Sequence, residues 1–226
     1  MSSVHSFENS DNQQQQPPQP PPPPSTFQSH DIGLRIQKKL FGRMMSNKTM
    51  AKTLIDSDST CLMDNLHRLC KLYCRQHDDK IVSSGPKEIA DKIVKYLMKI
   101  TIKVAILVMN HQLDNDEMYR MAKIQHSIRS ILMTIVSFHQ VDFSYERQYL
   151  QQQMQKCKTE LKQLIQRHLS EKSQKRIDFV FDFLGHSEFL DSFFTTTTNN
   201  SMDKQWLEMK ATIVEDINRL LERKNW

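Results

Sequence analysis

Glycine and proline are scarce in this chain outside one short stretch. The 226 residues contain four glycines and eight prolines, and seven of those prolines lie between Pro17 and Pro24. The longer part that follows is interrupted only by the four glycines and Pro86. Because glycine and proline are the strongest breakers of regular structure, this scarcity predicts an all-α domain.

The sequence also lacks an apolar signal sequence and a hydrophobic run long enough to cross a bilayer. A spanning helix needs about 20 predominantly apolar residues, and Lys103 interrupts the most apolar segment, residues 89–111. The four cysteines, without a signal sequence, fit a reduced setting. We therefore expect a cytoplasmic protein.

Motifs of catalysis are missing as well. The chain has no phosphate-binding glycine loop, no nucleophile elbow and no H-E-x-x-H pattern. Its basic residues are not interleaved with aromatics, and no nucleic-acid-binding motif is present. We expect no enzymatic activity, no cofactor and no nucleic-acid partner.

One pattern resembles a metal site: His67, Cys70, Cys74 and His77 read as H-x2-C-x3-C-x2-H. On one helix these residues spread over roughly 15 Å of rise, which is too far for one tetrahedral zinc ion. We interpret the two cysteines as small core residues flanked by the histidines, and expect no metal.

The first 30 residues differ from the remainder in composition and charge. Residues 1–30 are low in complexity, with a glutamine run followed by the prolines, and cannot bury enough apolar surface to fold. We expect a disordered tail with polyproline II character. Since this tail carries Glu8 and Asp11 but no Lys or Arg, the formal charge of +5 becomes +7 for residues 31–226. That excess suits an anionic partner.

Residues 89–111 are the expected centre of the fold. Four lysines fall within an arc of roughly 80° on a helical wheel: Lys92, Lys95, Lys99 and Lys103. Most of the remaining circumference is apolar, which is more than the ~100° stripe of a surface helix, so several sides must be covered. Either this is a core helix with solvated lysines, or its apolar excess lines an internal pocket and the lysines lie near the mouth.

Hydrophobic periodicity predicts further helices on both sides of this segment. Ser84 and Pro86 are the candidate cap and first residue of the central helix, Asp114 and Glu117 form a capping-box pattern, and Gly185 ends a later helix. The other expected helices are residues 32–45, 61–77, 114–138, 150–168, 170–184, 188–194 and 202–223. We expect one bundle of six or seven antiparallel helices after an amphipathic first helix.

The amphipathic segment at residues 32–45 has a basic side and an apolar side. Arg35, Lys38, Lys39 and Arg43 cluster on the basic side. Such a pattern is typical of a helix lying at a membrane interface. It equally fits a first helix packed on the domain with a charged outer face.

With these segments in order, the chain resembles the TIPE family, the proteins related to tumour-necrosis-factor-induced protein eight. The resemblance runs from about residue 32 to residue 194, then more weakly through the last helix. It rests on the order and spacing of short blocks, among them Lys38-Lys39-Leu40, Ile102-Lys103-Val104-Ala105, Val141-Asp142-Phe143 and Val180-Phe181-Asp182.

The resemblance implies about six helices around a long, open apolar cavity with a basic helix at its entrance. Family members bind phosphoinositides and related lipids, with acyl chains in the cavity and the headgroup at the mouth. They are linked to small GTPases, cell migration, inflammation and control of cell death. This favours the pocket interpretation, and the expected cavity-lining residues are Ile100, Val104, Leu107, Ile131 and Ile135.

The resemblance also implies headgroup contacts. Lys38 and Lys39 match the family's lysine pair on the entry helix, whereas two further basic positions correspond here to the uncharged Met109 and Gln125. Nearby basic residues are candidates to compensate. The full expected set is Lys38, Lys39, Arg43, Lys123 and Arg129.

We therefore expect a non-enzymatic signalling regulator that binds phosphoinositides or other anionic phospholipids and associates peripherally with membranes. It would act in apoptosis, inflammation or cell migration, with small GTPases as further candidate partners. The alternative is a helical adaptor for GTPase or death signalling that has no physiological lipid ligand and whose basic face meets acidic proteins.

Overall fold

The computed structural model describes residues 57–77, 85–141, 144–195 and 201–223, together with residues 28, 31–32 and 35–36. Within these ranges the regular structure is entirely helical. Seven helices follow one another: α3 (Ser57–Gln76), α4 (Pro86–Met109), α5 (Asn115–Gln140), α6 (Arg147–Ile165), α7 (Glu171–Leu184), α8 (Ser187–Phe194) and α9 (Ser201–Arg223). The predicted all-α fold is confirmed. The tail predicted for residues 1–30 lies outside the described residues, except for Gln28.

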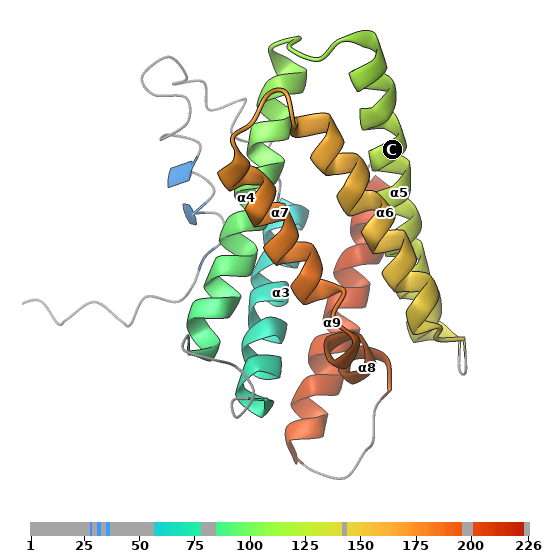
Figure 1. Cartoon of the computed structure of the whole chain (residues 1–226). Coiled ribbons are helices and arrows are strands. Elements are labelled where there is room, and N and C mark those ends of the chain that lie inside the picture. Colours follow the sequence, from blue (N-terminus) through green and yellow to red (C-terminus); the bar gives the residue numbers. More distant parts are fainter. Residues whose placement is uncertain are drawn as a thin grey trace, which may run out of the picture.

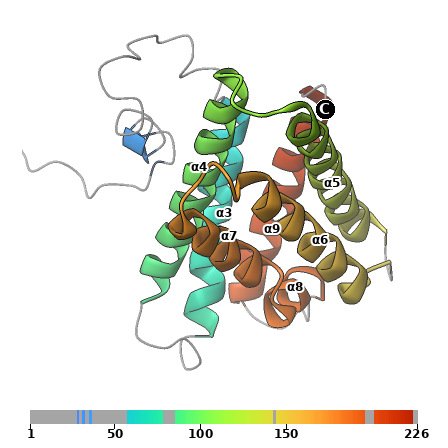
Figure 2. The ribbon, with the colours of Figure 1, turned by 45° about the horizontal axis from the view of Figure 1, so that its top comes forward.

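Six of these helices form a closed ring (Figures 1 and 2). Helix α3 packs against α4 and α9, α4 against α7, α7 against α6, α6 against α5, and α5 against α9. The short α8 contacts α6 and α7 and lies at the lower end of the bundle in Figure 1. Because each ring helix has two neighbours, the apolar faces turn toward a common centre.

Local signals explain most helix boundaries. The predicted capping box is confirmed: the Glu117 amide donates to Asp114 Oδ1 over 2.9 Å, and the Asp114 amide donates to Glu117 Oε2 over 3.0 Å. Gly185 is the C-cap of α7, as predicted. Helix α4 begins at Pro86, but its N-cap is Gly85 rather than Ser84.

The start of α3 was predicted wrongly. The sequence predicted a helix over residues 61–77, yet the helix begins at Ser57. An acidic side chain in the first turn suits the positive end of a helix, and Asp58 also accepts a hydrogen bond from Arg223 of α9 over 2.7 Å. This contact between distant segments is not visible in a hydrophobic pattern.

The described part of the predicted segment 32–45 consists of Ile32, Arg35 and Ile36, and all three are helical. Ile36 is buried against Val94 and Met98 of α4, and Ile32 packs against the same cluster, while Arg35 is exposed. At these positions the segment packs on the domain with its charge outward. Lys38, Lys39 and Arg43 lie outside the described residues.

Candidate functional site

An apolar cavity of about 200 Å³ lies inside the ring. All seven described helices contribute to its lining, which consists of Leu62, Met63, Leu66, Leu69, Leu97, Leu132, Ile135, Met154, Leu184, Phe189, Leu190, Phe193, Phe194, Ile213 and Ile217. Every one of these side chains is apolar. An apolar cavity of ~150 Å³ stays dry and accepts a benzene-sized molecule, so this one has room for a segment of hydrocarbon.

Helical spacing places these side chains on the inner faces. On α3, Leu62, Leu66 and Leu69 are four and three residues apart and therefore share one face. On α9, Ile213 and Ile217 are one turn apart in the same way. The cavity is thus built mainly where α3, α5, α8 and α9 face one another.

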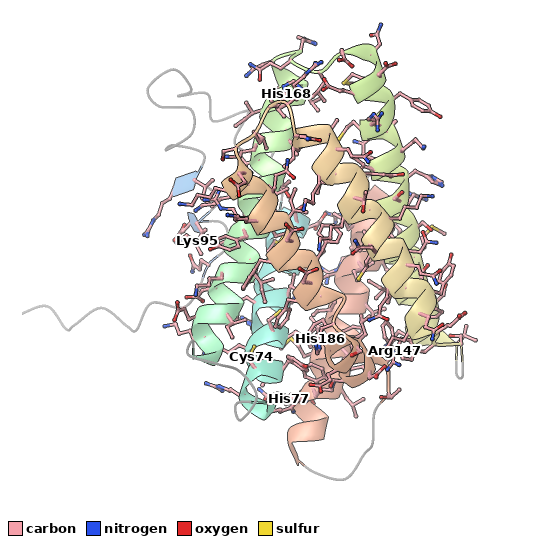
Figure 3. All side chains as sticks on the ribbon, in the orientation of Figure 1. Cys74, His77, Lys95, Arg147, His168 and His186 are labelled. Atoms are coloured by element: carbon pink, nitrogen blue, oxygen red, sulfur yellow. The ribbon has the colours of Figure 1, made fainter. Side chains whose placement is uncertain are left out.

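Helix α8 contributes four of the lining residues and is held in place by polar contacts. The indole of Trp206 donates to the Ser192 carbonyl over 2.7 Å, and the Tyr145 hydroxyl donates to Asp191 over 2.9 Å. Burial, reinforced by that hydrogen bond to Asp191, raises the pKa of Tyr145, so the phenol stays protonated and keeps its role as a donor. Arg147, near α8 in Figure 3, also contacts Asp191.

Among the five residues predicted to line a lipid cavity, Ile135 borders the apolar cavity, and the assignment of the five to lipid binding stays a prediction. Ile100, Val104 and Ile131 are buried in the packed core between α4, α5, α6 and α7, and Leu107 is 5% exposed near the end of α4. Hydrophobic periodicity identifies a buried face but does not distinguish contact with a neighbouring helix from contact with a void. The α3 and α9 residues were missed for that reason, although the leucine spacing on α3 is visible in the sequence.

The lysines of α4 do not lie beside this cavity. Leu97 is the α4 residue in the lining, and at about 100° per residue it lies roughly 160° from the middle of the lysine arc. Lys95 is exposed and points away from the bundle (Figure 3). Lys92 pairs with Glu88 over 2.7 Å. The basic strip of α4 therefore faces outward, between residues 31–36 and α7.

Lys123 and Arg129 are on the outer side of α5. The ammonium of Lys123 lies 5.8 Å from the Tyr119 ring centroid, and Arg129 borders a surface groove of about 530 Å³ with Met133 and Tyr149. None of the groove residues lines the apolar cavity. Their assignment to a headgroup stays a prediction, as does that of Lys38, Lys39 and Arg43, which fall outside the described residues.

The His–Cys pattern of α3 is divided between core and surface contacts. Cys70 and Cys74 are fully buried, while His67 Nε2 lies 2.7 Å from Asp91 Oδ1. His77 Nδ1 lies 3.0 Å from the Tyr73 carbonyl oxygen. Within the described part of the chain, no group of three His, Cys, Asp or Glu side chains is placed to hold a metal ion.

The fold therefore defines an all-α protein whose helices form a ring around an apolar cavity. None of the helices that the structure describes is long and apolar enough to cross a membrane. The chain belongs to the tumor necrosis factor alpha-induced protein 8-like family, whose model matches residues 27–224. The family suggested by the sequence blocks is therefore confirmed.

The relatives cover nearly the same length. "Protein salivary glands marred" of Drosophila melanogaster is 38% identical over 198 residues, covering 88% of this chain and 96% of that protein. Tumor necrosis factor alpha-induced protein 8 of Homo sapiens is 36% identical over 199 residues, covering 88% of this chain and 92% of the human protein. The Bos taurus protein of the same name is 37% identical over 199 residues.

Proposed function

We propose that this protein is a non-enzymatic signalling regulator that binds the hydrocarbon part of an anionic phospholipid in its central cavity. The observation that carries this proposal is the volume of about 200 Å³ lined only by apolar side chains. Such a lining offers hydrocarbon a dry environment, whereas a polar ligand would lose its hydrogen bonds there.

The energetics of an empty cavity support an occupant. Unfilled apolar volume in a protein interior is destabilising, because the side chains that line it lose packing contacts. A typical domain is stable by only ~5–15 kcal/mol. A bound hydrocarbon segment would restore much of the lost packing and would raise the free energy of unfolding.

The charge of the domain supports an anionic membrane surface as the source of that ligand. Residues 31–226 carry a formal charge of +7, and each Lys or Arg near such a surface contributes ~1 kcal/mol. We propose phosphoinositides or other anionic phospholipids, met by peripheral association from the cytoplasm. Membership in a family named for induction by tumor necrosis factor alpha supports a role in apoptosis, inflammation or cell migration, in which small GTPases are candidate partners.

The adaptor function is the second candidate, and the outer face of α5 favours it. Met118, Tyr119 and Met133 are exposed there by 44%, 68% and 50%, and Val141 follows at 57%. Met133 also borders the surface groove of about 530 Å³. Met118 and Tyr119 lie about 20 Å from Met133 along α5, so an interaction surface there would extend along the helix.

Native mass spectrometry of the protein purified from cells separates the two functions. A co-purified mass of a phospholipid, lost after organic extraction and regained on incubation with lipid, is the result expected for a lipid-binding protein. A clean apo mass under gentle ionisation, with no uptake of added lipid, would instead favour the adaptor.

A further inference from the structure

Two basic side chains lie along the seam between α4 and α7, each in contact with a residue of the other helix. Lys103 Nζ donates a hydrogen bond to Ser173 Oγ over 2.9 Å, and the Ser173 side chain belongs to a residue that is only 1% exposed. One turn further along α7, the Arg176 guanidinium lies 5.6 Å from the centroid of the Tyr96 ring. Both basic residues are half-buried, so their charges are only partly screened by water.

This basic pair has no counter-charge among the described residues. Among the residues that the structure describes, no carboxylate forms an ion pair with Lys103 or Arg176. The Nε atom of Arg176 is buried and has no hydrogen-bond partner. Burial, together with the charge of Arg176, lowers the pKa of Lys103. The positive charge of each side chain therefore disfavours the charged form of the other.

The acidic side chains of α7 bind elsewhere. Asp178 pairs with Lys162 over 2.8 Å and with Lys158 over 3.3 Å, both on α6. Glu171 pairs with Lys175 over 2.8 Å on the exposed side of α7 itself. The carboxylates of α7 thus neutralise lysines on the side that faces α6 and on the exposed side, and the side that faces α4 keeps its positive charge.

The start of α7 adds to this positive potential. Ser173 is the third residue of a 14-residue helix, and the N-cap Ser170 makes no side-chain capping hydrogen bond. A helix N-terminus carries a partial positive charge, so a lysine placed there is unfavourable unless an anion accompanies it. Two cations and a helix start consequently lie within one turn of α7 along the same seam.

We propose that Lys103, Ser173 and Arg176 form a binding site for a phosphate group. A phosphate would accept charge-assisted hydrogen bonds from the ammonium of Lys103 and from the guanidinium of Arg176. Its charge would also remove the repulsion between the two side chains. The site lies on the lysine side of α4, away from the cavity, and does not depend on acyl-chain binding. The phosphate belongs either to a soluble phosphorylated compound or to a lipid headgroup.

The test compares Arg176→Gln with the matched control Lys175→Gln, which removes an exposed lysine from the neighbouring position. Lys103→Met is a second variant of the site. Binding of inorganic phosphate is measured by titration calorimetry at constant ionic strength, and melting temperature is followed with chloride replacing phosphate. We expect Arg176→Gln and Lys103→Met to weaken phosphate binding about tenfold or more, as expected for loss of a hydrogen bond to a charged group. Lys175→Gln should bind as the wild type does.

In phosphate-free buffer Arg176→Gln should melt at or above the wild-type temperature, because the substitution relieves repulsion at Lys103. This outcome separates a ligand site from a structural role, since loss of a structural arginine would lower the melting temperature. Equal phosphate binding by wild type and Arg176→Gln, or no binding by the wild type, would overturn the proposal.

Vesicles distinguish the two sources of phosphate. Phosphatidylcholine vesicles are compared with and without phosphatidic acid. If the site takes a lipid headgroup, Arg176→Gln lowers binding to the vesicles that contain phosphatidic acid. If it takes a soluble phosphate, calorimetry shows the loss and vesicle binding is unchanged. Uptake of a fluorescent acyl chain, which reports on the central cavity, should be equal in all variants.

Discussion

Substituting Ile135 by phenylalanine tests whether the central cavity is a real void. Ile135 lines the cavity from α5, so the added ring atoms would enter free space. Phenylalanine is larger than isoleucine by about 25 Å³, so filling that volume recovers about 0.6 kcal/mol at the usual cost of a cavity, at the lower end of the about 0.5–2 kcal/mol that cavity-filling substitutions commonly gain. Phenylalanine brings no polar atom that would need a partner. In delipidated protein we expect Ile135→Phe to raise the melting temperature by about 1–2 °C.

When lipid is bound, Ile135→Phe should instead melt at a lower temperature than the wild type. A ligand at a hundred times its Kd stabilises the folded state by about 2.7 kcal/mol. Because Ile135→Phe occupies part of the binding volume, the variant should lose this ligand-dependent gain. Scanning calorimetry of the delipidated and lipid-loaded forms, combined with uptake of a fluorescent acyl chain, measures both effects on the same preparations.

Ile131 provides the matched control, one turn earlier on the same helix. Its side chain is 7% exposed and packs in the core between α4, α5, α6 and α7. Adding the same ring there overpacks the core, which costs ~1–3 kcal/mol, with or without lipid. If Ile135→Phe lowers the stability of the delipidated protein as much as Ile131→Phe does, there is no usable void at Ile135 and the reasoning is refuted.

Three further predictions concern charge and pH. Changing Lys38 and Lys39 together to glutamate should weaken binding to anionic vesicles at least tenfold in a sedimentation assay, because each basic residue contributes ~1 kcal/mol. High salt should weaken binding of the wild type in the same way. An unchanged affinity of the double variant would contradict a role of these lysines at the membrane. Burial lowers the pKa of His67 from 6.5 in spite of its hydrogen bond to Asp91. The unfolded state therefore takes up the proton first, stability should fall as the pH drops below 6.5, and His67→Gln should flatten that slope in thermal melts. Glu117→Gln should cost about 0.3–1 kcal/mol at neutral pH, because glutamine keeps the capping-box hydrogen bond but removes the negative charge that lies at the helix N-terminus beside Arg167 and His168. Burial raises the pKa of Glu117, but hydrogen bonds from the Asp114 amide and its basic neighbours outweigh this and lower it, so the difference from wild type should vanish in acid.

The helices could be predicted from the sequence because each depends on local information. Asp114 and Glu117 are three residues apart, and their reciprocal hydrogen bonds need no other part of the chain. Gly185 ends α7 in the same local way. The predicted start of α3 at residue 61 was wrong. The observed first turn includes Asp58, which accepts a hydrogen bond from Arg223 of the last helix. Local patterns therefore predicted the elements, whereas contacts between distant segments moved a boundary.

The cavity could be predicted only in part, since a void is a property of several helices together. Ile131 and Ile135 lie on the same side of α5 and read alike in the sequence. Both pack with the same core cluster, yet Ile135 lines the cavity and Ile131 does not. The two residues differ in how closely side chains of the other helices approach them. The cavity at Ile135 is also lined by side chains from the other helices, and no periodicity on α5 records how far away they are.

Helix α4 separates the two chemistries that the sequence suggested would meet at one mouth. Its apolar contribution to the cavity is Leu97, while Lys103 is on the outward, basic side and meets α7. Because a rigid helix separates the two regions, Ile135→Phe should change acyl-chain uptake and Arg176→Gln should change phosphate binding, each without the other. Substitutions at distant, independent sites usually add, so the double variant should show the sum of the two single effects on stability. A large deviation from that sum would mean that phosphate and hydrocarbon belong to one ligand, held across α4 by both regions.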